Sequence, residues 1–292
     1  MMQAKLNAFL YYLGDQSLLR ALWRWGVWAF RCLLRLPATV EIAGLGMRLY
    51  LVPHWKGCWK SIFVFRERFF DVSDPEWRFV ERVLRPGGVF VDAGAFQGWY
   101  TLVASRVVGP QGLAVAFEPN PDAYAILKRN VALNGRRNVR IFNCALSDAD
   151  GSAVLYRGPD DGVASSLGPV PGGKGQDEVT TRRLDDVVAE LKIRKVDFMK
   201  VDVEGAEARL LGGAGDVLRK STPVVLFEIY PAVARNMGVS ERAAWDFLGG
   251  HGYAFFALAG TDLVPLPVFP SLQDGAFLNV VAIRHAAGVE RE

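Results

Sequence analysis

VFVDAGAFQG, residues 89–98, decides the fold of this 292-residue chain. Its first three residues are apolar, as in a strand that is buried on both faces of a parallel sheet, and Asp92 ends the strand. Gly94 and Gly98 follow before a helix-like segment that begins near Trp99. Because ligands of open parallel sheets bind beyond the carboxyl ends of the strands, this turn predicts a ligand site. A tight turn with a purely structural role is the alternative.

The sequence after this strand alternates between strand-like and helix-like segments, which is typical of a wound α/β sheet. We expect seven strands in a mostly parallel sheet with helices on both faces, the last two strands being joined without a helix. The strands are expected at residues 89–92, 113–118, 139–144, 196–202, 224–229, 253–258 and 277–283. Helices are expected at 75–84, 99–107, 121–134, 185–192, 206–218 and 240–249, and a loop-rich excursion at 147–180.

The first turn does not have the spacing of a dinucleotide-binding loop. It reads D-x-G-x-x-x-G, whereas a pyrophosphate-binding turn reads G-x-G-x-x-G. A carboxylate at this place would repel a pyrophosphate, but it suits a cationic ligand such as an ammonium group. A Rossmann-type oxidoreductase is therefore a disfavoured alternative.

The second strand also ends in an acid. Glu118 lies 118 − 92 = 26 residues after Asp92 and is followed by Pro119 and Asn120. An acid at this place can accept hydrogen bonds from both ribose hydroxyls of a nucleoside. A nucleoside with a cationic tail, such as S-adenosyl-L-methionine, fits both acids. The third strand would then present Ala145, Leu146 and Ser147 to the adenine edge, with an ordinary turn as the alternative.

The series VFVDAGAFQG, AFEPNP, NVALN, NCALSD, DFMKVDVEGAE and VVLFEIYP, over about residues 65–285, resembles the FkbM-type S-adenosylmethionine-dependent methyltransferases. The resemblance implies a class I (Rossmann-like) methyltransferase fold and O-methylation of a sugar, glycan or polyketide-like hydroxyl. It matches Asp92, Gly94 and Gly98 to the methionine-side turn, Glu118 to the ribose acid, and Asn120, Ala145 and Leu146 to the adenosine side. The predicted cofactor-binding set also includes Ala93, Ala95, Pro119, Ser147 and Asp202. One departure is Phe96, where the family often has Asn.

The block KVDVEGAE, residues 200–207, holds the candidate catalytic groups. Asp202 is the predicted base that takes the proton of the acceptor hydroxyl, Glu228 is the second candidate, and Lys200 shares a strand face with Asp202. Two alternatives remain for Asp202, which are capping of the following helix and contact with the cofactor ammonium. No metal is predicted, and Mg²⁺ held by the acids at 202, 204, 207 and 228 is the alternative.

Two regions are predicted to shape the acceptor pocket. One is a small strand-rich cap at residues 39–74 with His54, Trp55 and Trp59, and the other is the excursion with Ser165 and Ser166. Glu204 completes the predicted substrate set. The alternative is a small apolar core next to an irregular loop.

Composition restricts the class of protein. The net charge is +3, of which residues 1–75 contribute +5, so the remainder carries 3 − 5 = −2 and nucleic-acid binding is not expected. The three cysteines form no metal or disulfide pattern, which favours a cytoplasmic protein. We predict four parts: an amphipathic helix region at 1–38, the cap at 39–74, the cofactor-binding domain at 75–286 and a tail at 287–292.

The segment SLLRALWRWGVWAFRCLLRL, residues 17–36, has four arginines and no acid. At about 100° per residue, Arg20, Arg24, Arg31 and Arg35 share a stripe about 60° wide, with Trp, Phe and Leu on the remaining surface. This pattern predicts a helix in peripheral contact with an anionic membrane. The alternative is a helix that packs on its own domain, and a non-catalytic membrane-tethered protein is the third function class.

Overall fold

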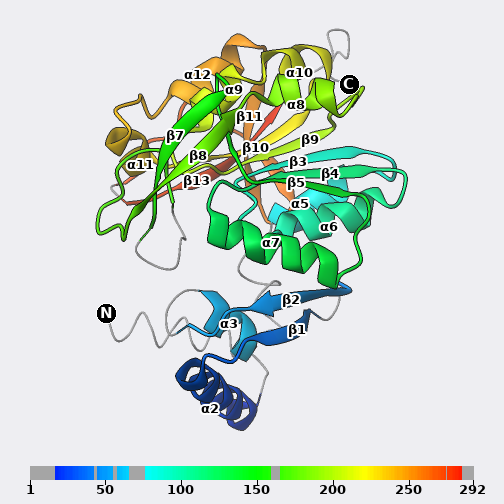
Figure 1. Cartoon of the computed structure of the whole chain (residues 1–292). Helices are drawn as coiled ribbons and strands as arrows, with labels where there is room; N and C mark the ends of the chain where they lie inside the picture. The colour runs from blue at the N-terminus through cyan, green and yellow to red at the C-terminus, as the bar shows by residue number, and fades with distance from the viewer. Residues whose placement is uncertain are drawn as a thin grey trace.

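A sheet of eight strands forms the core of the computed structural model, which describes residues 17–42, 45–54, 58–65, 76–158, 165–273 and 275–284 (Figure 1). The strand order is β12-β11-β13-β10-β9-β3-β4-β5. Strands β5, β4, β3, β9 and β10 run parallel to one another, whereas β13 is antiparallel to both β10 and β11. The strands are β3 (Val89–Ala93), β4 (Leu113–Phe117), β5 (Val139–Phe142), β9 (Phe198–Val201), β10 (Val224–Ile229), β11 (Ala254–Ala259), β12 (Asp262–Pro265) and β13 (Leu278–Ile283).

Helices cover both faces of the sheet because successive strand residues point to opposite faces. Phe90 faces a cluster that includes Phe79 of α5 and Ala104 of α6, and Val91 faces a cluster that includes Leu210 of α9 and Leu248 of α12. One face carries α5 (Glu76–Val83), α6 (Trp99–Val108) and α7 (Pro121–Leu133), and the other carries α8 (Leu184–Glu190), α9 (Glu207–Gly212), α10 (Gly215–Lys220) and α12 (Ala243–Gly250). The predicted α/β architecture is confirmed, with β12 as an additional edge strand.

Two helical predictions were wrong in detail. The single helix expected at 206–218 is two helices, because the chain between α9 and α10 passes close to another backbone segment. A Cβ at Gly213 would lie 2.0 Å from the carbonyl oxygen of Ser147. The short helix α11 (Pro231–Asn236) was missed, since six residues are too few for a periodic pattern.

The excursion expected to be loop-rich also contains two strands of a second sheet. This second sheet consists of β6 (Ala145–Leu146), β7 (Gly151–Tyr156) and β8 (Gln176–Arg182), in the order β6-β8-β7. Strands β7 and β8 pair along their full length in antiparallel register. These two strands were missed because the prediction followed the Gly and Pro residues between them and not the alternating pattern within them.

The N-terminal part contains a helix, a hairpin and a second helix. These are α2 (Leu18–Leu34), β1 (Ala38–Ile42), β2 (Met47–Leu51) and α3 (Cys58–Phe65). SIFVF, expected to be strand-like, lies in α3, because a short apolar run does not distinguish a strand from a buried helix. Helix α3 packs against α2, with the rings of Trp28 and Phe63 5.2 Å apart.

This N-terminal part packs on α6 and α7. Trp28, Val40 and Leu49 belong to one buried cluster with Leu102 and Val103 of α6. Within the described ranges, no helix has the length and the apolar character needed to cross a membrane. The predicted division into four parts stays a prediction, and residues 1–16 and the tail 287–292 lie outside the described residues.

Candidate functional site

A cavity of about 200 Å³ lies at the carboxyl ends of β3, β4 and β9, where the first turn predicted a ligand site. Three of its lining residues are acids, and they come from the ends of two strands and from the β9–α9 loop. The lining residues are Ala93, Gly94, Phe96, Phe117, Glu118, Pro119, Cys144, Ala145, Leu146, Leu155, Ser165, Leu167, Asp202, Val203, Glu204 and Ala206.

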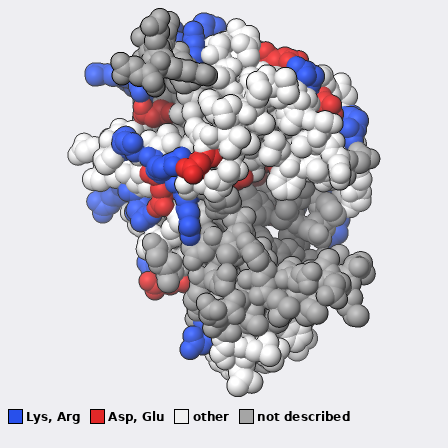
Figure 2. All heavy atoms as spheres, turned by 180° about the vertical axis from the view of Figure 1, so that it is seen from behind, with Lys and Arg blue, Asp and Glu red and all other residues white. Residues whose placement is uncertain are grey.

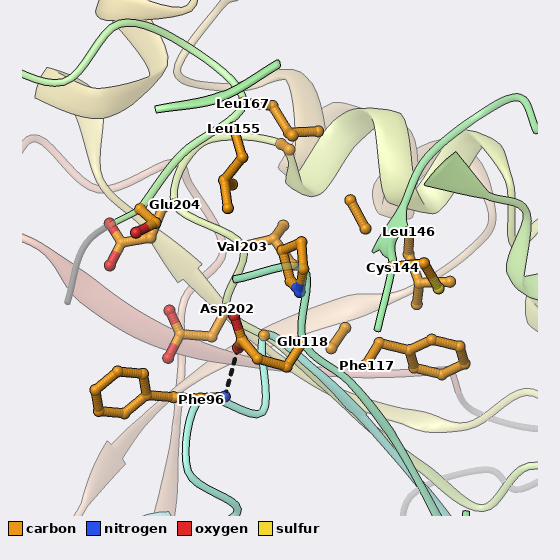
Figure 3. Close-up of a pocket in the computed structure, with 16 residues that line it drawn as sticks. Phe96, Phe117, Glu118, Cys144, Leu146, Leu155, Leu167, Asp202, Val203 and Glu204 are labelled. Atoms are coloured by element: carbon orange, nitrogen blue, oxygen red, sulfur yellow. Dashed lines mark hydrogen bonds between the residues drawn. The ribbon is translucent and has the colours of Figure 1, made fainter. Parts of the chain in front are cut away.

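The cavity has a polar side and an apolar side. Figure 3 shows the carboxylates of Asp202 and Glu204 on the side opposite Phe117, Cys144 and Leu146. Burial raises the pKa of the Cys144 thiol to about 11, so this side chain is neutral. The arrangement suits a ligand with a flat apolar part at one end and a cationic or hydroxyl-bearing part at the other.

Glycine is required at the turn after β3 because two backbone segments cross there. Gly94 has φ of 79°, and a Cβ on it would lie 1.8 Å from the carbonyl oxygen of Asp202. Phe96 in the same turn also has a left-handed φ, 48°. Asn adopts this conformation more readily than Phe, so the departure at Phe96 places a strained residue in the wall of the cavity.

Glu118 is held at the centre of the cavity by backbone donors. Its Oε2 accepts from the N–H of Phe96 at 2.7 Å, and its Oε1 accepts from the N–H of Asn120 at 2.9 Å. Burial raises the pKa of Glu118 to about 7, although these two donors act in the opposite direction. Each carboxylate oxygen retains capacity for one more donor, as a ribose diol would require.

Asp92 lies just beneath the turn and is 1% exposed. Its Oδ2 accepts from the hydroxyl of Thr101 at 2.5 Å, whereas its Oδ1 has no hydrogen-bond partner among the described residues. Burial raises the pKa of Asp92, and the nearby cation of Lys200 opposes that shift. A buried carboxylate oxygen without a donor is costly, so this position suits a cationic ligand.

Asp202 and Lys200 form an ion pair at the end of β9, as the alternation of strand side chains predicted. The Nζ of Lys200 lies 2.5 Å from Oδ2 of Asp202 and 4.6 Å from the centre of the Tyr100 ring. Lys200 is buried and Asp202 is not. Burial lowers the pKa of Lys200, but the Asp202 and Asp92 carboxylates outweigh it, and the net pKa is above the ordinary value.

Three further acids lie around this ion pair. Burial raises the pKa of Glu204 and of Glu207 to about 7, and that of Glu228 to about 9, with repulsion from Asp202 contributing in each case. Glu207 accepts from the N–H groups of Val203 and Gly205. In the part of the chain that the structure describes, no three His, Cys, Asp or Glu side chains are grouped as metal ligands.

Nine predicted site residues line the cavity, namely Ala93, Gly94, Glu118, Pro119, Ala145, Leu146, Ser165, Asp202 and Glu204. Asp92, Ala95, Asn120 and Ser147 are next to lining residues in sequence, and Lys200 pairs with the lining residue Asp202. Gly98 lies at the start of α6, outside the lining. The side chain of Asn120 caps α7 by accepting from the N–H groups of Asp122 and Ala123. It therefore supports Glu118 and the helix from behind the cavity wall.

The remaining predicted residues do not line this cavity. Glu228 borders a separate small hollow with Gly205 and Tyr230, because its position on β10 lies one strand further from the turn. Ser166 is buried, and its hydroxyl donates to the carbonyl of Glu204 at 2.5 Å. The carbonyl of His54 accepts from the Trp28 indole within the N-terminal part. Trp55 and the side chain of Trp59 lie outside the described residues.

Sequence reasoning missed seven lining residues: Phe96, Phe117, Cys144, Leu155, Leu167, Val203 and Ala206. Phe117, Cys144 and Val203 directly precede or follow predicted residues, so adjacency was an available signal. Leu155 and Leu167 come from the excursion, where only recognition of β7 would have indicated an inward-facing apolar residue.

The geometry agrees with comparisons to known proteins. A family model described as the Methyltransferase FkbM domain matches residues 92–255, more than half of the chain. The chain belongs to the FkbM methyltransferase family. The class I methyltransferase fold that the resemblance implied is confirmed by this match and by the strand order.

Three named relatives are similar in sequence to this chain. Methyltransferase sdnD of Sordaria araneosa is 33% identical over 156 residues, covering 43% of this chain and 60% of that protein. The 31-O-demethyl-FK506 methyltransferase FkbM of Streptomyces tacrolimicus is 31% identical over 234 residues, 70% of this chain and 84% of that protein. The 2-O-methyltransferase NoeI of Sinorhizobium fredii is 30% identical over 127 residues, 38% of this chain and 51% of that protein. The chain thus spans about 60% of the length of the Sordaria relative.

S-adenosylmethionine is the cofactor of this FkbM domain, as predicted. The described residues fit it, because Asp92 offers a buried oxygen that lacks a donor and Glu118 offers two partly engaged oxygens. The apolar side, with Phe117 and Leu146, fits a flat base.

Proposed function

We propose that this protein transfers a methyl group from S-adenosylmethionine to a hydroxyl oxygen of a sugar, glycan or polyketide-like small molecule. The observation that carries the proposal is the position of Asp202. Its carboxylate is part of the cavity lining, is accessible, and has Lys200 as its ion-pair partner at 2.5 Å. A hydroxyl acceptor needs such a base, because it must lose its proton as it bonds to the methyl carbon.

The roles of the residues follow from their positions. Glu118 binds the ribose hydroxyls, and Asp92 attracts the cationic part of the cofactor. When bound, S-adenosylmethionine supplies an electrophilic methyl group on a sulfonium. Asp202 takes the proton of the acceptor hydroxyl, and Lys200, a positioning residue, fixes the orientation of the Asp202 carboxylate through the ion pair.

Glu228 is a less suitable base than Asp202. Its pKa of about 9 keeps the side chain protonated at neutral pH, and it borders a different hollow. Glu204 lies on the same side of the cavity as Asp202 and has a pKa of about 7, so at neutral pH it is present in both forms. We assign Glu204 to the acceptor, as a hydrogen-bond partner for a second hydroxyl of a polyol.

The names of two relatives support oxygen as the methylated atom, since they describe a 31-O and a 2-O position. The experiment that tests the proposal supplies S-adenosylmethionine with a ¹³C-labelled methyl group to a panel of sugars, oligosaccharides and hydroxylated polyketides. NMR of the products distinguishes O-methyl from N-methyl and S-methyl carbons. An O-methyl product that requires the protein is expected. Methylation confined to nitrogen or sulfur would contradict the proposal.

A further inference from the structure

Helix α2 packs on the protein through one side, which carries Arg24. Arg24 is buried and donates to the carbonyl of Val64 at 3.3 Å. Ala21, Trp28 and Cys32 are buried on the same side, and the Trp28 indole donates to the His54 carbonyl at 3.0 Å. The helix is therefore fixed, and the side that points away from the protein is its apolar side.

This outward side is unusually apolar for a protein surface. Leu19 is 79% exposed, Leu33 74%, Trp23 68% and Phe30 59%. Nine of the thirteen exposed large apolar side chains in the described part of the chain lie between residues 18 and 36. We call these nine the apolar face: Leu18, Leu19, Leu22, Trp23, Trp25, Phe30, Leu33, Leu34 and Leu36. A continuous surface of this kind marks a site of interaction with a membrane or a protein.

The charges at the margin of the apolar face identify the partner. Residues 17–36 contain no acid, and Arg20 and Arg35 are exposed while Arg31 is half-buried. At about 100° per residue, Arg20 and Arg31 lie between the apolar face and the buried Arg24, and Arg35 follows directly after the last helical residue. A second copy of the chain would bring two such edges of like charge together. An anionic lipid surface offers the complementary charge along the edge and an apolar interior for the face.

The position of the helix allows this contact. Figure 1 shows α2 as the outermost element at its end of the molecule, and Figure 2 shows a patch of uncharged residues at that end with Lys or Arg side chains beside it. With 17 residues, the helix is about 25 Å long, and it lies along the surface of the protein. We propose that α2 docks this protein on an anionic membrane by inserting the apolar face into the interface, with Arg20, Arg31 and Arg35 at the phosphate groups.

The proposal is tested by co-sedimentation of the full-length protein with vesicles. One set contains phosphatidylcholine alone and the other contains about one-third phosphatidylglycerol. Binding to the anionic set is expected, and it should weaken as salt is raised because the lipid charges are screened. The double variant Leu19→Gln, Leu33→Gln should bind these vesicles at least tenfold more weakly. The control Val268→Gln alters a residue that is 72% exposed elsewhere, and it should bind within twofold of the unaltered protein.

A second variant separates charge from apolar insertion. Arg20→Gln with Arg35→Gln should weaken binding about tenfold at low salt and much less at high salt. All variants should keep their thermal midpoint and their affinity for S-adenosylmethionine, because the altered side chains are exposed and distant from the cofactor cavity. Undiminished binding by the leucine variant would overturn the proposal. It would also be overturned if the protein ignored anionic vesicles and formed a dimer that the leucine variant abolished.

Discussion

At the scale of single residues, Glu118 should make cofactor binding depend on pH. Its pKa of about 7 means that protons occupy the carboxylate below neutrality, whereas the ribose hydroxyls need it as an acceptor. The affinity for S-adenosylmethionine should therefore fall about tenfold from pH 8 to pH 6. Glu118→Gln should bind about 30-fold more weakly at pH 8, the equivalent of about 2 kcal/mol, and should lose most of this pH dependence. Calorimetric titration measures both, and an unaltered pH profile in the variant would refute the role of Glu118.

Glu228 should lower the stability of the ligand-free protein at high pH. Its pKa in the fold is about 9, well above the ordinary value of an unfolded glutamate, so the folded state holds a proton that the unfolded chain releases. Stability is then lost as pH rises from about 4.5 towards 9. Glu228→Gln should raise the thermal midpoint at pH 8.5 and have little effect at pH 5. An equal shift at both pH values would show that the carboxyl is not strained by its surroundings.

At the scale of elements, Ser166 joins the second sheet to the β9–α9 loop. Its hydroxyl donates to the Glu204 carbonyl and accepts from the N–H of Gly168. Ser166→Ala leaves both groups without that partner and should destabilise the protein by about 1–3 kcal/mol. It should also raise KM for the acceptor, because Glu204 is held at a φ of 53° that this contact supports. Ser152→Ala, at an exposed position on β7, is the matched control and should leave both quantities unchanged.

Some elements of the fold could be predicted from the sequence and others could not. The central strands and the acids at their ends were predictable, because a buried strand such as Val89–Ala93 begins with a continuous apolar run after a glycine and reaches its acid near the end. The apolar lining of the cavity was not predictable. Leu155, for example, reaches the cavity because β7 pairs with β8, whose residues lie about 25 positions further along the chain. Helix α3 was not predictable either, because its burial against Trp28 of α2, and not its local pattern, distinguishes it from a strand.

At the scale of the whole molecule, Asn130 links the N-terminal hairpin to the cofactor turn. It is completely buried, its Oδ1 accepts from the N–H of Tyr50 in β2, and its Nδ2 donates to the carbonyl of Gln97 in the turn after β3. Asn130→Ala leaves both groups unpaired and should destabilise the protein by about 2–4 kcal/mol. It should also weaken S-adenosylmethionine binding, since Gln97 belongs to the same turn as Gly94.

Asn134 provides the control for this prediction. It makes a similar bridge to the backbone of Arg48, but it is half-buried and its hydrogen bonds to Arg48 are open to water, which replaces the lost partners. Asn134→Ala should cost no more than about 1 kcal/mol and leave cofactor affinity unchanged. Denaturant unfolding and calorimetry compare the two variants. Equal losses would show that the link through Asn130 has no special importance for the turn.

The most direct test of the proposed mechanism is the rate of methyl transfer by Asp202→Asn, measured in single turnover with the acceptor identified by the labelled-methyl experiment. If Asp202 is the base, the rate should fall by about 10²–10⁴-fold while the affinity for S-adenosylmethionine stays within about threefold. The double variant Lys200→Met, Asp202→Asn controls for the buried cation that the single variant leaves without its partner. A rate equal to that of the unaltered protein, or a loss of cofactor binding in parallel with the rate, would contradict the assignment of Asp202 as the base.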